Sequence, residues 1–176
     1  MALGDITILR ESSFGAPGSR KHAVASGAAA TIKAGELVLK TPGDASVVVW
    51  TASNAAKPVV ATDWIAGLST STSTDTASAA GTVDIISDFS GLVFLGTPTT
   101  PATFGTATTG VTTQATYDAL VGDRVLLRTS AAGVQTIEPS DGATYGLVIE
   151  PLEIAKYPGK VAFSIKPGCS YLAQAS

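Results

Sequence analysis

At 176 residues the chain is long enough for one domain with its own hydrophobic core, and 45% of its residues are hydrophobic while only 14% are charged. Its formal net charge of -3 argues against a nucleic-acid binder that works by neutralising phosphates. No continuous apolar run approaches the ~20 residues that a membrane-spanning helix needs, so we expect neither nucleic acid nor membrane as a partner.

The N-terminal region combines one strand with a segment that cannot build a core. Residues 1–5 lack the basic region and apolar stretch of a signal peptide, so we expect folding in a cytoplasm. Residues 6–10 alternate as a strand does. Residues 12–22 are rich in Gly, Pro and Ser and locally basic, which is typical of a flexible or partner-ordered arm, or of a solvated loop. We therefore divide the chain into an N-terminal strand and arm, residues 1–22, and a single β domain, residues 23–176.

Strand signals dominate the next part of the chain. Short runs of Val, Ile, Leu and Thr recur between Gly, Pro, Asn and Asp, which predicts an all-β fold. Residues 31–40 and 46–50 form a predicted hairpin, and the apolar run of its second strand is typical of burial on both faces. The hydroxyl-rich tract at 69–78 is either an exposed loop or a β-edge, and strand character resumes at 79–86.

A second loop and one short helix follow. The apolar strand at 92–96 opens onto a Thr, Pro and Gly tract at 97–110, which is either a contact with a neighbouring subunit or a disordered loop. Thr113 caps a predicted helical turn at 114–120, and Gly122 ends it. Because so short a helix is unstable alone, we expect it to dock on the sheet.

The C-terminal third contains the clearest hairpin. Its strands, 124–129 and 134–138, flank a four-residue turn, and two further strands follow at 145–150 and 160–166. No period of fixed length repeats, which argues against solenoids and propellers. The sequence thus predicts a single-domain β-sandwich or β-barrel with one short helix and an extended N-terminal arm.

The side chains that carry chemistry are sparse. His22, the only histidine, lies in the predicted arm without a rigid orienting partner, and no nucleophile elbow or phosphate-binding loop occurs. Cys169 is the only cysteine, so we interpret it as a buried apolar residue and expect no disulfide and no metal site. Trp50 and Trp64 are more typical of core or interface anchors than of a sugar-stacking platform. We expect no enzyme, no catalytic residue and no cofactor.

Two stretches in the first half of the chain carry a family resemblance. Residues 28–38, and residues 64–72 together with 79–84, resemble small head-decoration proteins of tailed bacteriophages. Those proteins often begin a strand with the residues that stand here as Ala34-Gly35-Glu36-Leu37-Val38. They also carry Gly-Ile-Ala and Ala-Asp-Gly-Thr-Val patterns, from which this chain departs at 66–68 and 80–82.

The resemblance implies a compact β-barrel, β-sandwich or tulip-like fold that assembles as trimers or other oligomers on the outer capsid lattice. The implied function is a structural virion protein on the capsid surface that binds the major capsid protein and stabilises the shell, as a homo-oligomer with a trimer favoured. The alternatives are another virion component, from the tail, neck or fibre, and a carbohydrate-binding β-sandwich. The predicted capsid or subunit contacts are Ile6, Ile8, Arg10, Phe14, Arg20, Lys21, Trp64 and Phe104.

Overall fold

The fold is all-β. The computed structural model describes residues 6–10, 18–24, 31–40, 46–49, 64–74, 81–87, 89, 91–99, 113–130, 133–139 and 146–169. Within these residues the chain forms thirteen strands, one α-helix, α1 (Gln114–Asp118), and a 3-10 turn, η3 (Pro167–Cys169). The predicted all-β fold with one short helix is confirmed. No helix in the described ranges is long and apolar enough to cross a membrane.

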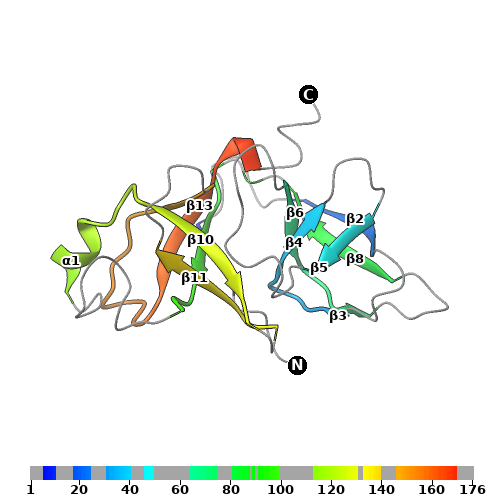
Figure 1. The fold of residues 1–176 in the computed structure, drawn as a ribbon, viewed down its shortest axis with the longest axis horizontal. Coiled ribbons are helices and arrows are strands. Elements are labelled where there is room, and N and C mark those ends of the chain that lie inside the picture. Colours follow the sequence, from blue (N-terminus) through cyan, green and yellow to red (C-terminus); the bar gives the residue numbers. More distant parts are fainter. Residues whose placement is uncertain are drawn as a thin grey trace.

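A six-stranded antiparallel sheet forms one side of the molecule, here called the sheet lobe (Figure 1). Its strand order is β1 (Thr7–Arg10), β9 (Val93–Gly96), β13 (Val161–Ile165), β12 (Leu147–Ile149), β10 (Arg124–Thr129) and β11 (Gln135–Pro139). The predicted C-terminal hairpin is therefore confirmed as β10 and β11, which pair from Val125↔Pro139 to Thr129↔Gln135.

The sheet lobe curls until it almost closes on itself. Residues 97–99, which continue β9, run along β11: Ile137 N donates to Thr97 O and Thr99 N donates to Ile137 O, both at 2.8 Å. A Cβ on Gly96 would lie 2.7 Å from Ile137 Cγ1, so only glycine lets the chain approach β11 this closely. The first residues of the predicted 97–110 loop are thus edge structure, and residues 100–110 lie outside the described ranges.

Five further strands pair in a closed ring, here called the ring lobe. The ring order is β2 (Ser19–Val24), β5 (Ser46–Val49), β4 (Leu37–Lys40), β6 (Trp64–Ser69) and β8 (Thr82–Ile86), and β8 pairs with β2 again. Only the β2–β5 pair is parallel. Figure 1 shows the ring lobe beside the sheet lobe, with β2 and α1 at opposite ends of the molecule.

Strand β2 corrects one sequence interpretation. Residues 19–22 are not part of an arm, because β2 pairs with β8 in continuous register from Ser19↔Ile86 to Ala23↔Thr82. Only Val24 is buried among the six residues of β2, so backbone pairing rather than side-chain burial holds this strand. Its sequence therefore gives almost no hydrophobic signal. Residues 11–17 of the predicted arm lie outside the described residues.

The hydroxyl-rich tract proves to be a β-edge where it is described. Its residues Ser73 and Thr74 form β7, which pairs with β3 (Thr31–Ile32). Hydroxyl groups of the tract bind the neighbouring backbone: Asp84 N donates to Ser71 Oγ at 2.9 Å and Thr70 Oγ1 donates to Asp84 O at 3.2 Å. These hydroxyl groups therefore hold the edge in place through hydrogen bonds to the backbone of β8.

The two lobes share their central strands. In β4, Leu37 and Leu39 belong to the large core under the sheet lobe, whereas Val38 belongs to the small core inside the ring. Strand β6 divides in the same way, since Ile65 faces the large core and Ala66 the small one. Because successive side chains of a strand point to opposite faces, β4 and β6 form a wall that is buried on both sides.

The turn at residues 33–36 fixes this junction, here called the seam. Gly35 has a φ of 83°, its carbonyl accepts a 3.1 Å hydrogen bond from Ile6 N of the sheet lobe, and the Glu36 carboxylate accepts one of 2.8 Å from Lys33 N. The Gln135 side chain donates to Leu37 O and accepts from Leu37 N, both at 2.9 Å. The segment that carries the family resemblance is thus the one that joins the lobes.

Candidate functional site

A surface hollow lies beside helix α1, at the far end of the sheet lobe. Thr113 has extended dihedral angles and its hydroxyl accepts a 3.2 Å hydrogen bond from Thr116 N, as an N-cap residue does. Tyr117 is fully buried, and its hydroxyl donates to Glu150 O and accepts from Ala162 N, both at 2.9 Å. Burial raises the pKa of Tyr117 to about 12. The predicted helix is therefore docked on the sheet, as expected.

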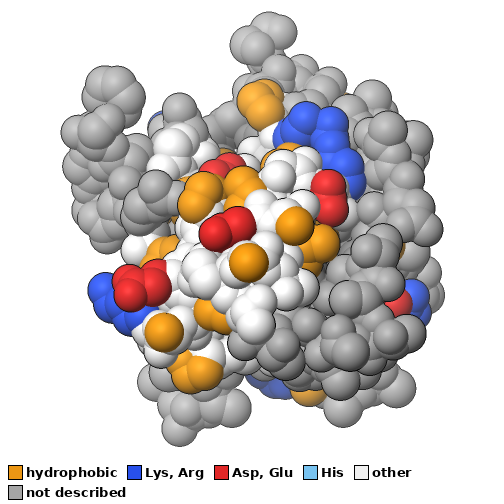
Figure 2. Space-filling view, turned by 90° about the vertical axis from the view of Figure 1, so that its left-hand side faces the viewer, with side chains coloured by type: hydrophobic (Ala, Val, Ile, Leu, Met, Phe, Trp, Pro, Cys, Tyr) orange, Lys and Arg blue, Asp and Glu red, His pale blue; other side chains and the backbone are white. Residues whose placement is uncertain are grey.

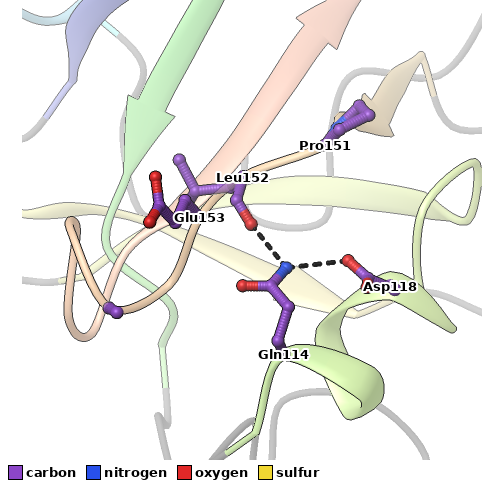
Figure 3. A pocket seen from close by; sticks show the side chains of 6 residues that line it. Gln114, Asp118, Pro151, Leu152 and Glu153 are labelled. Atoms are coloured by element: carbon purple, nitrogen blue, oxygen red, sulfur yellow. Dashed lines mark hydrogen bonds between the residues drawn. The ribbon is translucent and has the colours of Figure 1, made fainter.

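Gln114 ties this helix to the segment at 151–155. Its Nε2 donates to Asp118 Oδ1 at 2.7 Å and to Leu152 O at 2.8 Å (Figure 3). Its Oε1 accepts from Ile154 N at 3.1 Å. Both donors of the amide are thereby used. Gln114 thus positions the two sides of the hollow relative to one another and has no donor left for a ligand.

The hollow itself is shallow, open and acidic. It has a volume of about 530 Å³, and its rim carries two exposed carboxylates, Asp118 and Glu153. Pro151, Leu152 and Ala155 supply its apolar walls. Figure 2 shows that the apolar side chains on this end of the molecule are scattered among other side chains, backbone atoms and a few charged groups instead of forming a continuous patch. The arrangement suits a protein contact, because it offers apolar surface beside two carboxylates.

The described residues form no metal centre. Among them, no group of three His, Cys, Asp or Glu side chains is placed to hold a metal ion. Cys169 is fully buried, which confirms its interpretation as a core residue. His22 is half-buried on β2 of the ring lobe, far along the molecule from the hollow (Figure 1).

The predicted contact residues fall into two groups. Three of them, Ile6, Ile8 and Arg10, lie on or beside β1 in the sheet lobe. The others lie in the ring lobe, where Arg20 and Lys21 are exposed on β2 and Trp64 is half-buried on β6. Phe14 and Phe104 lie outside the described residues. The structure does not bring the two groups together as one contact surface.

Ile6 is the clearest correction among these residues. Its side chain is 1% exposed and belongs to the large core, so it holds the N-terminal strand in the fold and is not available for contact with a partner. The alternation of residues 6–10 correctly predicts a strand. It cannot say whether the apolar face meets the protein's own core or another subunit.

Sequence reasoning missed the hollow. Gln114 and Asp118 stand four residues apart on the predicted helix, a spacing that places them on one face and could have signalled their hydrogen bond. The opposite wall comes 38 residues later in the chain, and no local pattern links it to the helix.

Comparison with known proteins adds no relative: no protein-family model, no curated protein and no solved structure matches the chain.

Proposed function

We propose that this chain is a non-enzymatic structural protein of a tailed-phage virion, which binds the outer surface of the major capsid protein lattice and stabilises the shell. The observation that carries the proposal is the seam. Residues 34–38, which carry part of the resemblance to decoration proteins, hold two all-β lobes together through Gly35, Glu36 and Leu37. A decoration protein needs such a rigid body, because it must resist deformation while it bridges neighbouring capsid subunits.

The use of the polar side chains supports a structural role. Gln114, Gln135 and Tyr117 direct their hydrogen bonds to backbone groups of distant segments. A catalytic group needs instead a partner that orients it and space for a substrate beside it. Among the described residues, these three polar side chains therefore stabilise the fold by joining distant segments.

The surface supports lateral packing on a lattice. Only 14% of the residues are charged, and the β3–β7 edge presents the hydroxyls of Thr31 and Thr74, which share a 3.1 Å hydrogen bond. Surfaces depleted in charge lose less hydration free energy when a neighbouring subunit covers them. As a homo-oligomer, with a trimer favoured, the protein would repeat each weak contact many times over the lattice.

Copy number in purified particles tests the proposal. Quantitative mass spectrometry of particles from the source of this chain should give hundreds of copies, in a simple ratio to the major capsid protein. Isolated capsids that lack the protein should also take it up to the same ratio when it is added back. Tens of copies or fewer would place it in the neck or tail instead, and absence from particles would overturn a virion role altogether.

A further inference from the structure

The hollow beside α1 carries two carboxylates that no described cation neutralises. Asp118 Oδ1 accepts a 2.7 Å hydrogen bond from Gln114 Nε2, which fixes the orientation of this carboxylate. Glu153 is exposed, and Figure 3 shows it on the other side of Gln114 from Asp118. Lys156 places its Nζ 5.4 Å from the centre of the Tyr157 ring and forms no ion pair with either carboxylate. Both negative charges are thus left for a partner to neutralise.

The surface between these carboxylates is apolar. Pro151, Leu152 and Ala155 line the hollow, which has a volume of about 530 Å³ and is open to solvent. Lysine and arginine side chains bury their aliphatic stems along apolar surface while the charged end stays at its rim. A basic side chain therefore matches the hollow in both parts, with its stem against the walls and its charge against a rim carboxylate.

The opposite end of the molecule presents basic side chains. Arg20 and Lys21 are exposed on β2 of the ring lobe, and neither forms an ion pair within the described residues. Asp84 stands opposite Lys21 in the strand register, but no ion pair joins the two. Figure 1 places β2 and α1 at opposite ends of the long axis. The basic side chains and the acidic hollow therefore cannot meet within one chain.

Strand β2 is also a sheet edge where it carries these cations. On one side, β8 pairs with residues 19–23, whereas on the other side β5 pairs only with residues 23 and 24. Within the described chain, residues 19–22 thus have no strand on the β5 side, and they are here called the β2 edge. Successive side chains of a strand point to opposite faces, so Arg20 and Lys21 diverge. Laid edge-on over the hollow, the β2 edge reaches carboxylates on both of its sides.

We propose that the β2 edge of one copy of this chain docks on the acidic hollow of a second copy. Arg20 and Lys21 supply the cations, and Asp118 and Glu153 of the second copy receive them. Because the two surfaces differ, the contact is head-to-tail, and each pair keeps one hollow and one β2 edge for further copies until a ring closes or a filament grows. The contact rests on the proposed function only through the homo-oligomer, and it forms without a capsid.

Sedimentation of the purified chain tests the contact. At about 20 mM NaCl the unmodified chain should associate as its concentration rises, and about 0.5 M NaCl should weaken the association about tenfold, because salt screens charges at an exposed rim. A chain that remains a monomer at every concentration in low salt would overturn the proposal. Association that salt does not weaken would overturn it as well.

Charge reversal locates the contact. Lys21→Glu and Glu153→Lys should each weaken association about tenfold or more, because each places like charges together. An equimolar mixture of the two variants should associate again, since the unmodified β2 edge of one meets the unmodified hollow of the other, and this recovery also shows that both are folded. Lys160→Glu, the same change at an exposed cation of the sheet lobe, should not weaken association. Variants that associate normally, or a mixture that stays monomeric, would overturn the proposal.

Carbodiimide cross-linking identifies what occupies the hollow. The reagent joins an amine to a carboxylate that it contacts, so Lys21 should become linked to Glu153 or Asp118. In a mixture of isotope-labelled and unlabelled chains, peptides with one partner of each kind should appear, because the link joins two copies. Links from Lys21 to neither carboxylate in the associated protein would overturn the proposal.

Capsid occupancy separates this inference from the proposed function. Head-to-tail association of a chain that is absent from particles would support the contact and overturn the capsid role. Hundreds of copies on particles, from a chain that never associates with itself, would do the reverse. If the chain is a monomer and Glu153→Lys lowers capsid occupancy, the hollow binds the capsid protein instead, and a second copy is overturned as its occupant.

Discussion

Both lobes are built from β-strands, but different side chains fill their hydrophobic cores. The sheet lobe is filled by large aromatic rings: Phe94 stacks on Phe163 at 5.6 Å and meets Phe89 edge-on at 5.7 Å, with Tyr117 fully buried nearby. The described core inside the ring is aliphatic, and consists of Val24, Ile32, Val38, Val47, Ala66, Val83 and Ile85. Smaller side chains bury less apolar area, so this core stabilises its lobe less.

The difference shows why the ring lobe does not rely on its aliphatic core alone. Its wall strands β4 and β6 bury their other face in the aromatic core, through residues such as Leu37 and Ile65. The ring thus depends on the sheet lobe for part of its stability. That support helps to offset the cost of burying the His22 Nε2 atom, which has no hydrogen-bond partner among the described residues.

The largest effect is expected from the aromatic core. Phe94→Ala should lower the free energy of unfolding by about 3 to 5 kcal/mol, because it removes a fully buried ring that contacts two others. Urea unfolding should be followed both by far-UV circular dichroism and by tryptophan fluorescence. Since both tryptophans belong to the first 64 residues, fluorescence reports on the half of the chain that builds the ring.

Shared strands predict that both signals move together in Phe94→Ala. Val83→Ala, which trims the aliphatic core, is the matched control, and should cost about 2 kcal/mol. If the fluorescence transition of Phe94→Ala stayed where it is in the unmodified chain, the ring would be independent of the aromatic core, and the comparison between the lobes would fail.

The seam should give the next largest effect. Gln135→Leu leaves Leu37 N and O without their side-chain partner in a buried position, at a cost of about 2 to 3 kcal/mol. Because the lost bonds join the lobes, we expect the fluorescence transition to precede the dichroism transition. Val134→Ala, at a neighbouring residue that is 40% exposed, should change stability by less than about 0.5 kcal/mol. If the fluorescence and dichroism transitions of Gln135→Leu coincided, at the same urea concentration as in the unmodified chain, the Gln135–Leu37 hydrogen bonds would not be what joins the lobes.

Tyr117 should give a smaller effect that depends on pH. Tyr117→Phe should cost about 1 to 2 kcal/mol at neutral pH, because Ala162 N and Glu150 O lose the hydroxyl. Burial raises the pKa of the folded hydroxyl to about 12, above the value of about 10 in the unfolded chain. The contribution is therefore complete below pH 10 and is lost between pH 10 and 12, as the unfolded chain ionises first.

The measurement is the difference in unfolding free energy between the unmodified chain and Tyr117→Phe across that pH window. Tyr157→Phe removes a hydroxyl from a half-buried ring beside Lys156 and serves as the control, with a smaller loss at neutral pH. A difference that stays constant from pH 9 to 12 would contradict the buried, hydrogen-bonded state of the Tyr117 hydroxyl.

What the sequence predicts well is local. Strands β10 and β11 and helix α1 appear close to their expected places, because alternation, a turn and a capping threonine are all written in adjacent residues. Burial of Cys169 follows from residue type alone. These features depend on no distant contact.

What the sequence does not predict is set by distant pairing. Gln135 and Leu37 are 98 residues apart, and nothing near either one signals the other. The sequence does not predict strand β2, because its mostly exposed, polar residues are typical of a loop; the strand forms because its backbone pairs with β8. Closure of the ring has the same origin, because β2 pairs with β5 and β8, which come later in the chain.

The smallest effect on the free energy of unfolding is expected from the ion pair between Arg128 and Glu138, on the outer face of the β10–β11 hairpin. Arg128 Nε donates to a Glu138 carboxylate oxygen, but their side chains are 43% and 30% exposed. A double-mutant cycle with Arg128→Gln and Glu138→Gln should therefore give a coupling energy below about 1 kcal/mol, and about 0.5 M NaCl should reduce it further. Gln135 lies on the opposite, buried face of the same strand, so one strand tests both environments. A coupling as large as the loss in Gln135→Leu would mean that exposure does not decide which polar contacts stabilise this fold.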